Sequence, residues 1–230
     1  WFTVLDLKDA FFCVPLDKKS QSIFAFEWES PATGRKTQLT WTVLPHGFEN
    51  SPTIFGNQLA KELEIWKKQN QEGGVLLQYV DDILIAVKSR EECFKITISL
   101  LNFLGQGGYR VSRSKAQIGK EAVIYWGFEI SQGQRQLGTE RKEAICQIPE
   151  PSSLKDMRSF LGMIGWCRLW ILNYGLYMKP LYEALKESKD WYLVWTPGCQ
   201  KSFKEHKREL MMAPALSLPD LTKPFELFVH

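Results

Sequence analysis

The chain of 230 residues lacks the residue patterns of several common protein classes. Its three histidines are far apart in the sequence, so they do not indicate a zinc site. Its five cysteines are odd in number and include no CxxC, which predicts reduced thiols of an intracellular protein that is not secreted. The most apolar stretch, 160–178, is interrupted by Arg168 and Asn173, so we expect no transmembrane helix, and nothing resembles a signal peptide.

What the sequence does contain is typical of a folded globular protein. Hydrophobic residues make up 44% and charged residues 24%, and a chain of this length can bury about 70% of its unfolded surface. The formal net charge is only +3, but seven basic and three acidic residues lie between Gly105 and Lys142. This basic stretch is compatible with a phosphate-binding surface and equally with a solvated face.

Hydrophobic periodicity predicts an α+β fold through about residue 131, followed by a helical lobe. Strands are expected at 1–5, 23–28, 38–44, 75–80 and 83–87, then a hairpin near 123–130 that turns at Gln132-Gly133. Helices are expected near 50–69, 89–104, 140–148, 154–171, 176–186 and 200–212. Because the chain opens in a strand and ends in an alternating strand at 225–230, we expect a piece of a longer polypeptide.

Carboxylates form the most distinctive chemical pattern. Asp6 ends the first predicted strand, and Asp81-Asp82 joins two apolar strands. Adjacent buried carboxylates repel each other and lose hydration, a cost that Mg²⁺, a cation preferring oxygen ligands, offsets. If the first strand pairs beside the acidic hairpin, the three carboxylates can hold two ions about 4 Å apart. A solvated Asp-Asp turn with Asp6 as a helix cap remains the alternative from pattern alone.

Several motifs nevertheless occur in the order typical of one family. LLQYVDDILIAV resembles the catalytic motif of reverse transcriptases, and VLDLKDAFFCVPL resembles their first carboxylate motif. FAFEW, QLTWTVLPHGF, NSPTIF, YWGFEISQGQRQL, FLGMIGWCRLWI and APALSLPDLTKPFELFV are further matches that together cover nearly the whole chain. The sequence of these motifs most resembles the gammaretroviral, murine-leukaemia-type reverse transcriptase, which is part of a Pol polyprotein of a virus or an endogenous retrovirus.

This resemblance implies a right-hand polymerase fold and RNA- or DNA-templated DNA synthesis. It assigns 1–15 and 49–131 to the palm, 16–48 to the second part of the fingers, 132–217 to the thumb and 218–230 to the start of the connection subdomain. It also implies further fingers before the chain and an RNase H domain after it. The implied partners are an RNA or DNA template with primer, deoxynucleoside triphosphates and the rest of the Pol polyprotein, in the cytoplasm or a virion core, with no membrane.

The resemblance also implies the metal ligands. Asp6 and Asp81 match the two metal-binding aspartates, Asp82 the third acid, and the Leu7 carbonyl an additional ligand. The expected cofactor is two Mg²⁺ ions, with Mn²⁺ as the alternative.

Other matched positions imply contacts with the nucleotide and the primer. The Asp9 and Ala10 peptide N–H groups would approach the triphosphate, Phe11 matches an aromatic gate against the ribose 2′-hydroxyl, and Lys115 matches a lysine near the leaving phosphate, a possible general acid. Contacts with primer and template are expected from the YVDD tyrosine, the primer-grip hairpin and a thumb track, that is, from Tyr79, Tyr125, Trp126, Gly127, Phe128, Gly162 and Trp166. Core packing is the alternative for Phe11 and for the thumb face.

One position departs from the family pattern. His46 replaces the glutamine of LPQGF, which contacts the nucleotide and template, and an imidazole cannot present an amide's donor and acceptor together. The missing fingers and His46 keep a second hypothesis open, a catalytically inactive endogenous remnant with residual nucleic-acid binding. An unrelated metal phosphohydrolase does not account for the primer-grip and thumb motifs.

Overall fold

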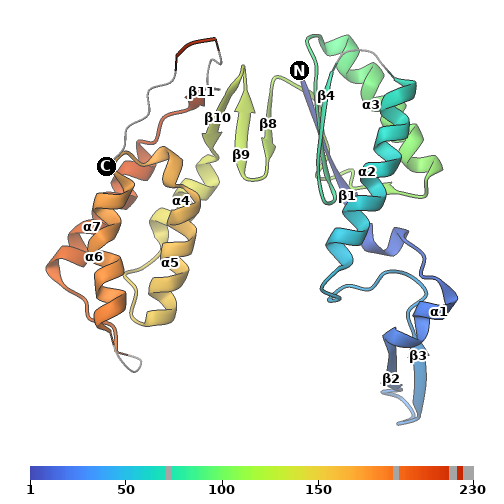
Figure 1. Cartoon of the computed structure of the whole chain (residues 1–230), viewed down its shortest axis with the longest axis horizontal. Helices are drawn as coiled ribbons and strands as arrows, with labels where there is room; N and C mark the ends of the chain where they lie inside the picture. The colour runs from blue at the N-terminus through green and yellow to red at the C-terminus, as the bar shows by residue number, and fades with distance from the viewer. Residues whose placement is uncertain (71–73, 189–191, 218–221, 225–230) are drawn as a thin grey trace. The chain divides into compact units, whose positions relative to one another are not determined.

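The computed structural model describes residues 1–70, 74–188, 192–217 and 222–224. The chain divides into two compact units, Trp1–Val123 and Ile124–His230 (Figure 1). The strand predicted at 225–230 lies outside the described residues. In the described part, none of the helices combines the length and apolar character that a membrane crossing requires.

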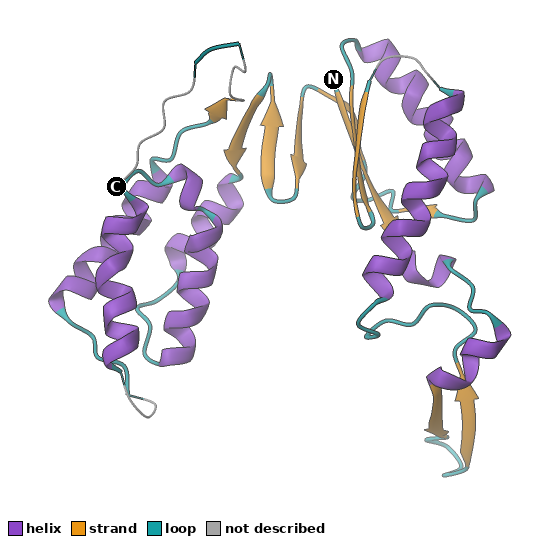
Figure 2. Ribbon diagram, in the orientation of Figure 1, coloured by secondary structure: helices purple, strands orange, loops and turns teal. Residues whose placement is uncertain are grey.

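An antiparallel sheet forms the centre of the first unit. Its strand order is β4 (Val75–Tyr79), β5 (Asp82–Ala86), β1 (Phe2–Lys8) and β6 (Arg110–Val111), and β7 (Gln117–Lys120) also pairs with β1. Two helices, α2 (Ser51–Gln69) and α3 (Arg90–Gln106), lie on the same side of the strands (Figure 2). Their apolar faces share one core with the sheet, including Leu5, Ile83, Phe55, Leu59 and Leu100.

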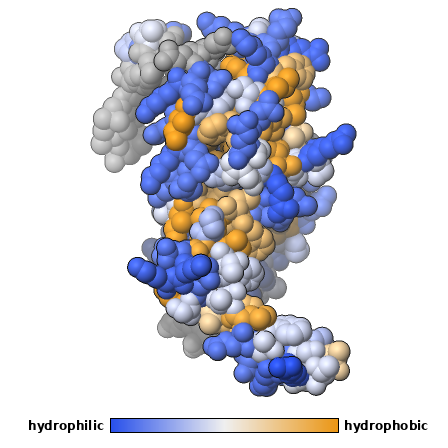
Figure 3. Space-filling model, turned by 90° about the vertical axis from the view of Figure 1, so that its right-hand side faces the viewer, coloured by the Kyte–Doolittle hydropathy of each residue, from blue (hydrophilic) through white to orange (hydrophobic). Residues whose placement is uncertain are grey.

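A two-stranded hairpin, β2 (Ala25–Glu29) with β3 (Lys36–Thr40), extends from the first unit (Figure 1). Short helical segments precede it, namely η1 (Ala10–Cys13), α1 (Lys18–Gln21) and η2 (Ser22–Phe24). Every residue of both strands is exposed, so burial adds little to its stability. Aromatic packing at its base compensates in part, because Phe12 stacks on Trp41 with ring centroids 5.6 Å apart. Hydrophobic and hydrophilic residues are mixed on the face shown in Figure 3. Phe26 and Leu39 of the hairpin are exposed.

The second unit contains a helical lobe and most of a small sheet, whose strand β8 begins at Ala122 before the boundary between the units. The sheet order is β11 (Leu216–Ser217), β10 (Gln134–Leu137), β9 (Phe128–Ser131) and β8 (Ala122–Tyr125). The helices are α4 (Thr139–Gln147), α5 (Leu154–Trp166), η3 (Arg168–Trp170), α6 (Tyr174–Glu187) and α7 (Pro197–Met211).

The second unit differs from the sequence prediction at two places. The single hairpin expected near 123–130 is two successive hairpins, because Trp126 and Gly127 also adopt positive φ and make a turn. The helix expected over 154–171 ends at Trp166. Gly165 in its last turn lowers helix propensity, and Cys167, just after it, is buried in the core.

A buried histidine lies in the core of the helical lobe. His206 of α7 has no exposed surface, and its Nδ1 lies 2.8 Å from the Ser202 carbonyl oxygen. The rings of Tyr174 and Tyr177 meet the imidazole nearly edge-on. Within the described residues its Nε2 has no hydrogen-bond partner. Burial lowers the pKa of His206 below its usual value, while the Ser202 carbonyl opposes that shift.

This histidine predicts acid-sensitive stability. Below pH of about 6.5 the unfolded chain binds a proton that the folded chain resists, so the unfolding free energy should fall as pH drops from about 6.5 towards the lowered folded pKa. In His206→Phe this part of the fall should disappear. Urea unfolding of wild type and His206→Phe between pH 5 and 7.5 measures this difference. An equal fall of the unfolding free energy in both proteins would contradict the prediction.

Candidate active site

The pairing of β1 with β5 positions the first two carboxylates. Their antiparallel register runs from Phe2 opposite Ala86 to Asp6 opposite Asp82. Directly opposed residues point to the same face of a sheet, so the two carboxylates share one face. The first strand therefore does pair beside the acidic hairpin.

The third carboxylate lies on a constrained turn between β4 and β5. Val80 has φ of 50°, a conformation that costs a β-branched residue about 1–3 kcal/mol. The turn is held in place by backbone contacts. The Gln78 side chain donates to the Val80 carbonyl at 3.1 Å and to the Gly56 carbonyl at 3.0 Å. The Leu7 N–H donates to the Asp81 carbonyl at 3.1 Å, which ties the turn to β1.

The negative charges in this cluster are unevenly compensated. Burial, followed by the charges of Asp81 and Asp6, raises the pKa of Asp82 above its usual value, and the charge of Lys115 opposes this shift. Lys115 Nζ lies 3.0 Å from Asp6 Oδ2. Its hydrogen bond to Asp6 raises the pKa of Lys115 in turn.

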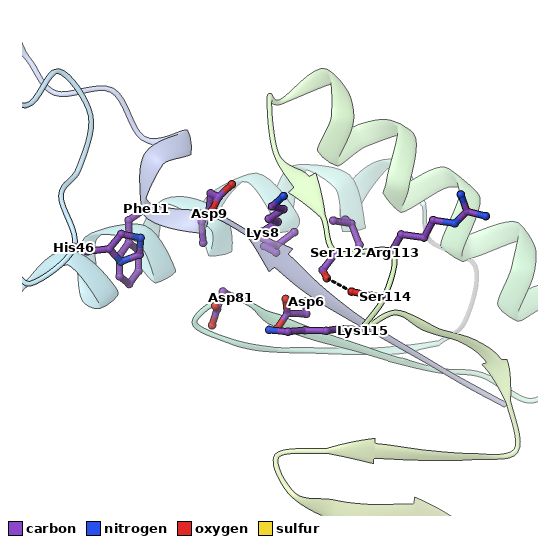
Figure 4. A pocket seen from close by; sticks show the side chains of 13 residues that line it. Asp6, Lys8, Asp9, Phe11, His46, Asp81, Ser112, Arg113, Ser114 and Lys115 are labelled. Atoms are coloured by element: carbon purple, nitrogen blue, oxygen red, sulfur yellow. Dashed lines mark hydrogen bonds and ion pairs between the residues drawn. The ribbon is translucent and has the colours of Figure 1, made fainter.

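A cavity of about 990 Å³ opens beside these residues (Figure 4). It brings together most residues predicted for metal and nucleotide binding, namely Asp6, Leu7, Asp9, Ala10, Phe11, His46, Asp81 and Lys115. Lys8, Val111, Ser112, Arg113 and Ser114 complete its wall and were not singled out from the sequence. Asp82 is not part of the lining but lies opposite Asp6.

The backbone at Asp9 is another constrained point on the cavity wall. Asp9 has φ of 53° and precedes the short helix η1, which begins at Ala10. Its carboxylate pairs with Arg110, whose Nη2 lies 3.1 Å from Asp9 Oδ2. No sequence pattern predicts this ion pair, because its two residues are 101 positions apart.

Phe11 packs against the core and also lines the cavity. Its ring packs edge-on against Phe55 of the core, with centroids 5.8 Å apart. His46 lies against it, with centroids 5.0 Å apart, and packs edge-on to Phe12 at 4.6 Å. Figure 4 shows the His46 and Phe11 rings together at one end of the cavity. His46 therefore takes part in an aromatic cluster that a glutamine could not form.

Four of the residues predicted to contact primer and template lie close together in the second unit, namely Gly127, Phe128, Gly162 and Trp166. Trp126 and Gly127 form the turn between β8 and β9, and Phe128 stacks on Trp166 with centroids 4.2 Å apart. A cavity of about 900 Å³ is lined by Gly127, Gly162 and Trp166, among others. Gly162 is exposed, whereas Trp166 is half-buried in an aromatic stack.

The basic stretch makes two kinds of contact. In the first unit Arg110 and Lys115 pair with carboxylates. In the second unit the guanidinium of Arg135 lies over Phe128 and that of Arg141 lies over Trp166.

The carboxylate oxygens of Asp6, Asp81 and Asp82 are the type of ligand that a divalent cation such as Mg²⁺ prefers. Among the described residues no group of three or more histidine, cysteine, aspartate or glutamate side chains is arranged to hold a metal ion. Burial first, and then the charges of Asp81 and Asp6, nevertheless raise the pKa of Asp82, while Lys115 opposes the shift. Carboxylate oxygens that repel each other in this way suit a hard cation such as Mg²⁺.

Comparisons with known proteins identify the family. The model of the family "Reverse transcriptase (RNA-dependent DNA polymerase)" matches residues 1–130. The chain is 48% identical over 229 residues to the Pol polyprotein of feline endogenous virus ECE1 and to the Gag-Pol polyprotein of gibbon ape leukemia virus. Each alignment covers all of this chain but only 22% and 13% of those polyproteins.

Solved structures show the same fold. The foamy viral protease-reverse transcriptase dRH in complex with double-stranded DNA matches with a TM-score of 0.84 and 32% identity, over 95% of this chain and 36% of that one. The foamy viral protease-reverse transcriptase in complex with RNA/DNA hybrid matches with a TM-score of 0.81 and 32% identity, over 92% and 27%. The chain therefore belongs to the reverse transcriptase family, and its sequence is of the gammaretroviral type, as predicted.

The charge balance around Asp82 gives a paired prediction. Lys115→Ala removes the opposing positive charge and should raise the pKa of Asp82 further, whereas Asp81→Asn removes a negative charge and should lower it. Titration of the Asp82 carboxyl carbon by NMR measures both variants. Shifts in the same direction would contradict this account of the cluster.

Proposed function

We propose that the protein containing this chain is an RNA- and DNA-directed DNA polymerase whose chemistry takes place at Asp6, Asp81 and Asp82. The observation that carries the proposal is the register that sets Asp6 opposite Asp82 beside a cavity of about 990 Å³. The solved relatives bound to double-stranded DNA and to RNA/DNA hybrid support a template–primer duplex as the partner. The chain spans 13–22% of the polyproteins named above, so the RNase H domain and further fingers are proposed for the longer protein.

In this proposal the subdomains follow the predicted boundaries. Residues 1–15 and 49–131 belong to the palm, 16–48 to the fingers and 132–217 to the thumb, with 218–230 entering the connection. The exposed hairpin β2–β3 supports a fingers assignment, because it extends from the sheet and has both faces open.

Two Mg²⁺ ions, or Mn²⁺, would be held by Asp6 and Asp81, with Asp82 and the Leu7 carbonyl as further groups. When bound, such ions activate the primer 3′-hydroxyl and stabilise charge on the phosphates. The aspartates position these cations, and Lys115, on the same side of the cavity, supplies a proton donor for the leaving group.

The remaining lining residues orient the nucleotide. The peptide groups of Asp9 and Ala10 face the triphosphate, and the positive φ of Asp9 supports this role because such strain is common at functional sites. Phe11 excludes a ribose 2′-hydroxyl, and His46 backs its ring. Tyr79 and the hairpin residues Tyr125–Phe128 position the primer strand, and Gly162 and Trp166 border its minor groove.

An inactive remnant is less well supported. All three aspartates are present, and most of the predicted metal- and nucleotide-binding residues line one cavity. His46 departs from the family glutamine but is accommodated by packing against Phe11 and Phe12.

Removing one proposed metal ligand tests the chemistry. Asp81→Asn should lower the rate of primer extension about 100-fold or more, because cation stabilisation of the transition state contributes several kcal/mol. Its affinity for primer–template should change little. Extension by wild type should also stop when Mg²⁺ and Mn²⁺ are removed with a chelator.

Asp17→Asn is the matched control, since Asp17 caps α1 through the Lys19 N–H, a role that asparagine also fills. It should extend primers like wild type. Undiminished extension by Asp81→Asn, measured on a labelled primer in gels, would contradict the assignment.

The aromatic gate gives a second test. Phe11→Val should raise incorporation of ribonucleotides relative to deoxynucleotides, because the smaller side chain leaves room for the 2′-hydroxyl. Phe12→Val is the control, because the Phe12 ring stacks on Trp41 and does not line the cavity. The readout is the ratio of single-nucleotide incorporation efficiencies. An unchanged ratio in Phe11→Val, or an equal rise in both variants, would return Phe11 to a core role.

A further inference from the structure

Arg141 lies at the centre of a group of contacts that no motif of the chain singles out. Its guanidinium carbon lies 4.0 Å from the centroid of the Trp166 ring, and Phe128 stacks on the same ring at 4.2 Å with planes 8° apart. Two groups this close to one centroid would collide on a single face. The indole is therefore sandwiched between Arg141 and Phe128, which adds a cation–π contact to a stack of rings.

The same guanidinium also covers the turn between β8 and β9. Gly127 has φ of 75°, and a Cβ there would come within 3.1 Å of Arg141 Cζ and 3.3 Å of its Nε. The turn thus needs glycine for its backbone conformation and for the close approach of the guanidinium. The Gly138 N–H, just before α4, also faces the Gly127 carbonyl at 3.4 Å. Arg141 consequently contacts the hairpin turn and α5 at once.

These contacts connect two elements that the proposed function uses separately. The turn belongs to the proposed primer grip, and Trp166 belongs to the proposed thumb track. Gly127, Arg141 and Trp166 also line the cavity of about 900 Å³ in this unit, together with the exposed Gly162. The Arg141 guanidinium therefore lies against both the turn and α5, where it can fix the distance between them.

We propose that Arg141 is a positioning residue for primer extension, which holds the β8–β9 turn against Trp166 so that the turn and α5 present the primer as one rigid surface. The inference rests on the proposed function and adds to it a residue that need not touch the primer. A misplacement of about 1 Å at a reacting terminus can cost about 100-fold in rate, so a contact of this kind affects catalysis through geometry.

The planar guanidinium is essential to the argument. It stacks flat on an indole and at the same time covers the glycine turn, whereas an ammonium keeps the charge but has no flat surface. Arg141→Lys therefore removes the geometry and preserves the charge. Arg135→Lys is the matched control, because the Arg135 guanidinium lies over Phe128 and Trp170 in the same unit without covering Gly127.

The experiment has two readouts on the full chain and on the longer protein that contains it. The first is the single-nucleotide incorporation rate at saturating primer–template and nucleotide. Arg141→Lys should lower this rate about tenfold and change the affinity for primer–template less than threefold, while Arg135→Lys stays within twofold of wild type. The second is amide hydrogen exchange of the segment 125–128, which should become faster in Arg141→Lys and not in Arg135→Lys.

Gly127→Ala approaches the same contact from the other side and should speed the exchange of the turn as well, since the methyl group pushes on the guanidinium and the positive φ strains alanine. Unchanged exchange in Arg141→Lys would overturn the proposal, as would equal effects of Arg141→Lys and Arg135→Lys. If wild type extends no primer, the polymerase assignment fails, but the exchange measurement still decides whether Arg141 holds the turn.

Discussion

The antiparallel pairing of β1 with β5 is the constraint on which the candidate active site depends. Leu5 lies opposite Ile83 in this register, and both side chains are fully buried. A slip of one residue would turn these side chains out of the core and separate Asp6 from Asp82. The hydrophobic burial that stabilises the first unit therefore also places its two paired carboxylates on one face. No further interaction is needed to place Asp6 opposite Asp82.

The cost of this placement appears in two forms. Burial, followed by the neighbouring like charges, raises the pKa of Asp82, and the turn holds Val80 in a left-handed conformation. The hydrogen bonds of Gln78 and the Leu7 N–H oppose the strain, and Lys115 offsets part of the charge. Strained backbone and a perturbed pKa are common at functional sites, which supports the proposed role of this cluster. In the second unit a single side chain also serves two contacts, because the Arg141 guanidinium covers both the Gly127 turn and the Trp166 indole.

Sequence reasoning was most successful where local pattern decides structure. The apolar strands around Asp81-Asp82 and the helices α2 and α3 follow from periodicity, and the motif order identified the family. It could not place Arg110 on Asp9 or Arg141 on Trp166, because those contacts depend on how distant segments pack. The basic stretch shows the same limit, since two of its side chains pair with acids and two stack on rings. The end of α5 was predicted too late, because the helical pattern of apolar residues continues past Trp166 whereas the helix itself ends there.

Binding of Mn²⁺ tests the central claim most directly, because it depends on the carboxylates and not on primer extension. Calorimetric titration of the wild-type chain at pH 7 should show Mn²⁺ binding that weakens as pH is lowered, since protons compete for the same oxygens. Asp6→Asn should lose this binding, and Asp17→Asn should keep it. Equal Mn²⁺ affinity in wild type and Asp6→Asn would contradict the account, because Asp6, which the β1–β5 register sets opposite Asp82, would then not be a ligand of the bound ion.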